Sequence, residues 1–149
     1  MRIALDIDDV IRDLQSQLKL LHPEWCGTKY NIPDVRLRDI DYRHALVNDM
    51  PTFDFTMYIT SCPPWAYNDT LKWLKDNGFP NKKVIMSSIK LSTMRIYGID
   101  ILVDDKPSTF YQVNSKHDTV CYLYDQPWNR DIETPLRVHS LAEFWERVS

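Results

Sequence analysis

The sequence predicts an α/β protein in which helices cover both faces of a mostly parallel, five-stranded sheet, giving three layers. Two observations predict this fold. Short apolar segments alternate along the chain with segments whose apolar residues recur every three or four positions, the pattern of strands and helices. Two of the apolar segments also end in neighbouring acidic residues, and parallel sheets bind ligands at the carboxyl ends of their strands. With 149 residues, the chain is expected to form one domain.

The first predicted strand covers residues 3–5 and ends in three carboxylates within four positions, Asp6, Asp8 and Asp9. Carboxylates crowded together repel one another, so the site needs a hard cation, and Mg²⁺ on oxygen ligands is the usual answer. A helix is predicted directly after them, and Asp9 could instead serve as its cap. The apolar positions of this helix are Ile11, Leu14, Leu18 and Leu21.

Residues 23–53 are a candidate insertion before the second strand, because the composition changes there. Proline and glycine mix with aromatic residues, and only residues 37–47 look helical. A small helical cap at this place, which the family resemblance described below implies, would exclude water from the site and select the substrate. The alternative is a surface excursion with its own small hydrophobic cluster.

The second predicted strand covers residues 53–59 and leads into Thr60 and Ser61. A helix follows, with Pro64 near its start and the pair Asn77-Gly78 at its end. A hydroxyl at the end of a strand, followed by the backbone amides of a helix start, can hold a phosphate without adding charge. Thr60 is therefore the first candidate for phosphate binding and Ser61 the second, while a simple helix cap is the alternative.

Two further strands are predicted at residues 82–86 and 99–103, with a short helix near Lys90 between them. The second of these strands ends in Asp104 and Asp105, which repeats the arrangement after the first strand. Acids that are far apart in the sequence can then share one cation at the same edge of the sheet. The remaining elements are a strand at residues 119–124 and a closing helix from Ser140.

These segments resemble the four motifs of the haloacid dehalogenase (HAD) superfamily, in their order and in their placement on strands. The resemblance covers nearly the whole chain and implies a Rossmann-like sheet with the first strand central, beside the fourth. Asp9 departs from the family pattern, because many members have glycine there; aspartate tolerates a positive φ better than most residues. The matching positions are Asp6-Ile7-Asp8, Thr60, Lys90 and Asp104-Asp105.

The resemblance also implies a role for each motif residue. Asp6 would be the nucleophile and Asp8 the general acid and base, while Thr60 and Lys90 would hold the oxygens of the transferring phosphoryl group. Ser61 is a second candidate for the same phosphate. The implied Mg²⁺ ligands are Asp6, the backbone carbonyl of Asp8, Asp104 and, directly or through water, Asp105.

The implied reaction is Mg²⁺-dependent hydrolysis of a phosphomonoester through an aspartyl-phosphate. The segment 127–130 looks like the corresponding stretch of 5'(3')-deoxyribonucleotidases and their phage and bacterial relatives, so a nucleoside monophosphate is the preferred substrate; Asn129 and Arg130 could also merely fasten the loop. A sugar phosphate, a nucleic-acid terminal phosphate and a non-catalytic HAD-like ligand-binding module are the alternatives. Aromatic residues that could stack on a base, or simply fill the core, are Trp25, Tyr30, Tyr42 and Trp65.

The composition sets outer limits on function. The formal charge is −3 and no run of lysine or arginine occurs, which argues against binding to extended nucleic acid. No apolar stretch is long enough to span a bilayer and no signal-peptide pattern is found, so a cytoplasmic protein is expected. The odd number of cysteines, without metal-ligand spacing, favours reduced thiols at Cys26, Cys62 and Cys121.

Overall fold

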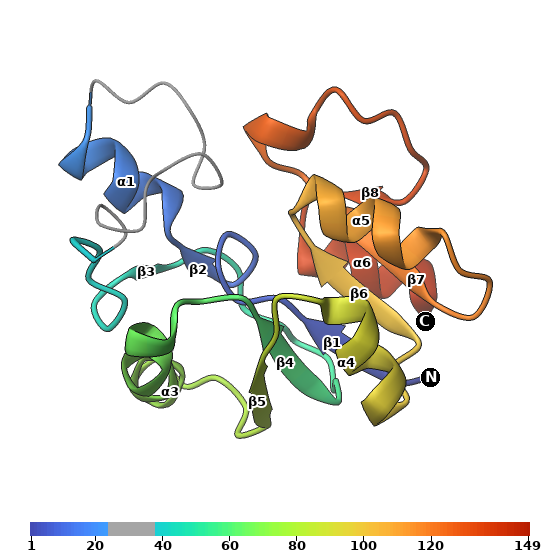
Figure 1. Ribbon diagram of the computed structural model, residues 1–149, viewed down its shortest axis with the longest axis horizontal. Coiled ribbons are helices and arrows are strands. Elements are labelled where there is room, and N and C mark those ends of the chain that lie inside the picture. The colour runs from blue at the N-terminus through green and yellow to red at the C-terminus, as the bar shows by residue number, and fades with distance from the viewer. Residues whose placement is uncertain (24–37) are drawn as a thin grey trace.

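The computed structural model describes residues 1–23 and 38–149 (Figure 1). Within them, one sheet contains six strands in the order β5-β4-β1-β6-β7-β8, and every neighbouring pair is parallel. The predicted parallel sheet is therefore confirmed, with one strand more than expected, because the two-residue β8 is too short to be recognised from its pattern. The strands are β1 (Ile3–Leu5), β4 (Met57–Thr60), β5 (Lys83–Met86), β6 (Ile101–Asp104), β7 (Val120–Tyr124) and β8 (Arg137–Val138).

Helices cover both faces of this sheet. Helices α3 (Tyr67–Asp76) and α6 (Leu141–Val148) pack on one face, in a core cluster with alternate strand residues such as Leu5. Helices α4 (Lys90–Tyr97) and α5 (Pro107–Asn114) pack on the other face, in a second cluster that contains Ala4. Successive side chains of a strand point to opposite faces, so β1 is buried on both sides. The result is the predicted three-layer arrangement.

Strand β1 is central, between β4 and β6, as predicted. Leu5 is in register with Tyr58 of β4 and with Val103 of β6. The backbone N–H of Asp6 also donates to the carbonyl oxygen of Val103 at 3.0 Å, so the pairing with β6 continues into the first acidic residue. Acidic residues that follow β1 and β6 are therefore delivered to the same edge of the sheet.

The first helix begins later than predicted. Asp9 adopts a left-handed backbone conformation, with φ of 66°, and the chain then forms the short strand β2 (Arg12–Asp13) before α1 (Gln15–Leu21). Asp9 Oδ1 accepts hydrogen bonds from the backbone N–H groups of Leu14 and Gln15, both at 2.9 Å. Asp9 therefore binds two backbone amides at the start of α1, but it is not the N-cap of this helix, because the N-cap is Leu14 and the helix begins at Gln15.

The helical expectation for residues 37–47 is wrong over its described part, residues 38–47. These residues form turns and the strand β3 (Leu46–Val47), which pairs antiparallel with β2. A side chain binds the backbone here, because Trp73 Nε1 of α3 donates to the carbonyl oxygen of Ala45 at 2.7 Å. This carbonyl therefore bonds to another element of the fold. Residues 24–37 of the candidate cap, with Trp25, Cys26 and Tyr30, lie outside the described residues.

The second strand also begins later than predicted, at Met57 instead of residue 53. The aromatic residues before it belong to the core without being part of the strand. Phe53 stacks on Trp145 of α6 with ring centroids 4.9 Å apart, and Phe55 meets Tyr58 edge to face.

Among the helices of the described residues, none has the length and apolar character needed to cross a lipid bilayer.

Candidate functional site

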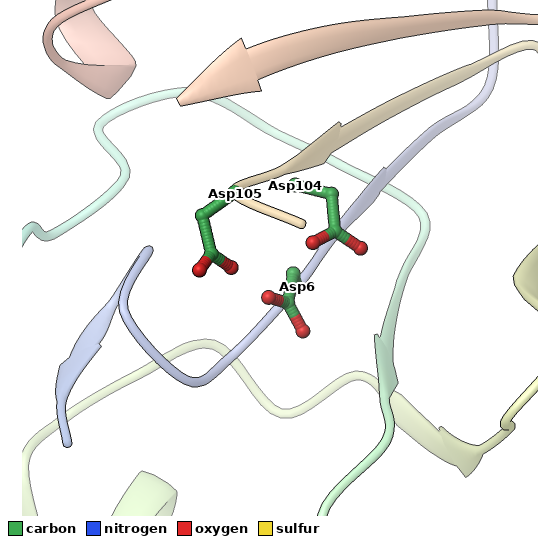
Figure 2. Close-up of side chains that lie close together, drawn as sticks. All are labelled: Asp6, Asp104 and Asp105. Atoms are coloured by element: carbon green, nitrogen blue, oxygen red, sulfur yellow. The ribbon is translucent and has the colours of Figure 1, made fainter. Parts of the chain in front are cut away.

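Three carboxylates meet at the carboxyl ends of β1 and β6 (Figure 2). Asp6 follows β1, Asp104 ends β6 and Asp105 comes directly after it. One carboxylate oxygen from each lies within 4.8 Å of the others, and all three side chains are buried. The structure thus brings together the acids of the first and fourth predicted strands, although nearly a hundred residues separate them in the sequence.

Lys90, the first residue of α4, lies between two of these acids. Its Nζ atom donates to Asp6 Oδ1 and to Asp104 Oδ2, each at 2.7 Å, and its side chain is only 3% exposed. Burial opposes the charge of Lys90, but the negative charges of Asp104 and Asp6 outweigh it and raise the pKa of this lysine above its ordinary value. Lys90 is therefore a fixed cation at this site.

The donor set fits a hard divalent cation. Three buried carboxylates converge beside one ammonium group, and carboxylate oxygens are the ligands that Mg²⁺ prefers. The backbone N–H of Lys106 donates to Asp104 Oδ1 at 3.0 Å, which fixes the orientation of that carboxylate. Asp6, Asp104 and Asp105 are the residues that could hold such an ion.

The side chain of Asp8 lies apart from this cluster and forms an ion pair with Arg12, a residue that sequence reasoning missed. Arg12 Nε donates to Asp8 Oδ1 at 2.7 Å, and Nη1 donates to Thr70 Oγ1 at 3.0 Å. The fully buried guanidinium also lies over the rings of Tyr42 and Trp73, 5.1 and 5.3 Å from their centroids. The four-residue spacing of Asp8 and Arg12 is the signal in the sequence that could have indicated this pair.

A pocket of about 530 Å³ opens beside the carboxylates. Asp6, Asp8 and Asp104 line it, so Asp8 faces the same pocket as the nucleophile candidate Asp6. Residues with hydroxyl groups also line it, including two after β5 that sequence reasoning missed, Ser87 and Ser88. The remaining wall consists of Leu14, Tyr42, Pro63, Pro64, Trp65 and Met86, together with Cys62 and Lys106.

The two phosphate-binding candidates after β4 differ in their position. Thr60 is fully buried, and its Oγ1 accepts a hydrogen bond from the backbone N–H of Cys62 at 3.2 Å. Ser61 is exposed and lines the pocket. Thr60 therefore organises the turn after the strand, whereas Ser61 presents its surface to the pocket.

The aromatic candidates within the described residues, Tyr42 and Trp65, both line the pocket. Trp65 is 43% exposed, and the guanidinium of Arg38 lies 4.9 Å from its ring centroid. Tyr42 is buried against Arg12. Trp65 is thus the aromatic surface that remains open to a ligand.

The loop after β7 supports Asp105. Asn129 is fully buried and donates from Nδ2 to the backbone carbonyls of Asp105 and Tyr124, at 2.9 and 2.8 Å. Arg130 points to Asp125, with a contact of 3.3 Å and a side chain that is 63% exposed. Both residues fasten the C-terminal loop, which is the alternative that the sequence left open for them.

No protein-family model matches the chain, and no curated protein matches it. The function of the site must therefore be inferred from the chemistry and geometry of its own residues.

Proposed function

We propose that this protein is a Mg²⁺-dependent phosphomonoester hydrolase of the HAD type that works through an aspartyl-phosphate on Asp6. The convergence of Asp6, Asp104, Asp105 and Lys90 at one edge of the parallel sheet carries the proposal. Phosphoryl transfer depends mainly on positioning and on charge neutralisation, and a buried lysine between two carboxylates supplies both.

Asp6, Asp104 and Asp105, with the backbone carbonyl of Asp8, would hold the metal ion. When bound, Mg²⁺ offsets the repulsion between the nucleophilic carboxylate and the anionic phosphate. Lys90 holds Asp6 through a bond of 2.7 Å and so orients the nucleophile before the substrate arrives.

In the first step, a carboxylate oxygen of Asp6 attacks phosphorus, a new bond joins Asp6 to the phosphoryl group, and the bond to the leaving alcohol breaks. Asp8, protonated at this stage, gives its proton to the leaving oxygen. Asp8 lines the same pocket as Asp6, which supports this role, and Arg12 fixes the position of its carboxyl group.

In the second step, Asp8 as a carboxylate takes a proton from water, and the hydroxide formed attacks the phosphoryl group. The bond to Asp6 breaks, inorganic phosphate leaves, and the Asp6 carboxylate is restored. Of the two hydroxyl groups at the end of β4, that of Ser61 lies at the pocket wall and could hold phosphoryl oxygens, while Thr60 Oγ1 binds the backbone of the turn.

A nucleoside monophosphate, deoxy or ribo, is the proposed substrate class. The pocket volume of about 530 Å³ falls within the usual range for small-ligand sites. Trp65 lines the pocket with a partly exposed side chain on which a base could stack. A sugar phosphate would use the carboxylates without needing this side chain.

Phosphate release from a panel of substrates tests the proposal. The panel contains deoxy- and ribonucleoside monophosphates, sugar phosphates, a 5'-phosphorylated oligonucleotide and an aryl phosphate, each with Mg²⁺ or EDTA. We expect metal-dependent release that is highest for mononucleotides and disappears in Asp6→Asn. Asp54→Asn is the matched control, because Asp54 pairs with Lys82 on the surface and lines no part of the pocket. Release that survives in Asp6→Asn would refute the nucleophile, and no release from any substrate would favour a ligand-binding module.

A further inference from the structure

The loop after β7 contacts Asp105 at both its side chain and its main chain. The indole Nε1 of Trp128 donates to Asp105 Oδ2 at 3.1 Å. The amide of the next residue, Asn129, donates to the backbone carbonyl of Asp105 at 2.9 Å. Because Asp105 is fully buried, the Trp128 donor fixes the orientation of its carboxylate, while Asn129 holds its main chain.

The loop that carries Trp128 is itself anchored on two sides. Arg137 of β8 donates from Nη1 to Asn129 Oδ1 at 2.7 Å and from Nη2 to the carbonyl of Asn129 at 2.8 Å. Gln126 donates from Nε2 to the carbonyl of Asp9 at 2.8 Å, which ties the loop to the turn after β1. A donor on such an anchored loop resists rotation of the carboxylate that it holds.

We propose that Trp128 is a positioning residue that makes Asp105 a one-oxygen ligand and thereby favours Mg²⁺ over Ca²⁺. This inference rests on the metal site of the proposed function. Mg²⁺ demands a near-octahedral shell at short distances, whereas Ca²⁺ accepts irregular shells and often takes both oxygens of one carboxylate. The N–H group on Asp105 Oδ2 competes with a metal for that oxygen, so it opposes binding through both oxygens.

The variant Trp128→Phe tests this role, because it removes the N–H donor and keeps an aromatic ring. Mg²⁺ and Ca²⁺ are each titrated into metal-free protein by isothermal calorimetry, and the ratio of the Ca²⁺ Kd to the Mg²⁺ Kd is compared. We expect the ratio to fall about tenfold, the scale on which partners of metal ligands act. Both ions are titrated into the same preparation, so loss of folded protein cancels in the ratio.

Trp145→Phe is the matched control. Trp145 belongs to α6 and stacks on Phe53 in the core. The same substitution there should therefore leave the ratio of the two Kd values at its wild-type value. An unchanged ratio in Trp128→Phe would overturn the inference, as would a wild-type protein that binds neither ion.

The calorimetric result is separate from turnover. Metal-dependent phosphate release together with an unchanged ratio would overturn the role of Trp128 and leave the hydrolase standing. A lowered ratio in a protein that releases no phosphate would support the role of Trp128 and reject the hydrolase.

Discussion

Arg12 and Asp8 form an ion pair of 2.7 Å in which the guanidinium is fully buried. The same arginine bonds to Thr70 of α3 and lies over two aromatic rings, so it connects the loop after β1 to a neighbouring helix. The position of the proposed acid and base therefore depends on a tertiary contact.

Replacing Arg12 by methionine should destabilise the protein and misplace Asp8. Removing one partner of a buried pair leaves the other charge uncompensated, so we expect the free energy of unfolding to fall by about 3 kcal/mol, measured by urea denaturation. Arg130→Met is the control: its pair with Asp125 is exposed, and its loss should cost less than about 1 kcal/mol. Equal losses in the two variants would contradict a structural role for the Arg12 pair.

Replacing Lys90 by methionine should separate metal binding from turnover. The variant loses the ammonium group that lies between Asp6 and Asp104, so the cluster becomes more negative. We expect Mg²⁺ to bind more tightly, on the order of tenfold, because one repelling charge is gone. Phosphate release should nevertheless fall by about a hundredfold, since Asp6 loses the ammonium group that orients it.

Calorimetry for Mg²⁺ and a phosphate-release assay on the same Lys90→Met preparation check both halves of this prediction. Lys82→Met is the control, because Lys82 pairs with Asp54 on the surface. Weaker Mg²⁺ binding in Lys90→Met would mean that the lysine organises the carboxylates more than it repels the ion.

Replacing Ser140 by alanine should lower stability without changing activity. Ser140 Oγ accepts a hydrogen bond from the N–H of Glu143 at 3.0 Å, at the start of α6. Loss of such a cap costs about 1 kcal/mol, which a thermal or urea melt can measure. Ser115→Ala, which follows the end of α5, is the control and should cost less. A fall in kcat at constant KM would show that α6 reaches the site.

The thiols of Cys62 and Cys121 should react slowly with iodoacetamide in the folded protein. Burial raises the pKa of both thiols, so less thiolate is present at pH 8 than for an exposed cysteine, and the rate should rise as the pH increases further. Cys62 lines the pocket, so a bound phosphate ester should slow its reaction more than that of Cys121. Peptide mass spectrometry distinguishes the two sites, and urea-unfolded protein is the control.

Several features of the fold could be predicted because they depend on local pattern. The strands that precede Asp6 and Asp104 are apolar, and each ends abruptly in acids, so their type and direction follow from a few neighbouring residues. Boundaries were less predictable: the start of α1 depends on the left-handed φ of Asp9, and the start of β4 depends on where pairing with β1 begins.

The sequence by itself determined which residue types end the strands of this protein, and hence that Asp6, Asp104 and Lys90 would face one edge of a parallel sheet. Only the tertiary structure decided which partners these groups have. Arg12 is fixed beside Asp8 by Thr70, 58 positions further along the chain, and Trp128 meets Asp105, 23 positions before it, because β6 and β7 are neighbours. These two contacts join residues far apart in the chain, and the packing and strand pairing that create them leave no mark in local sequence.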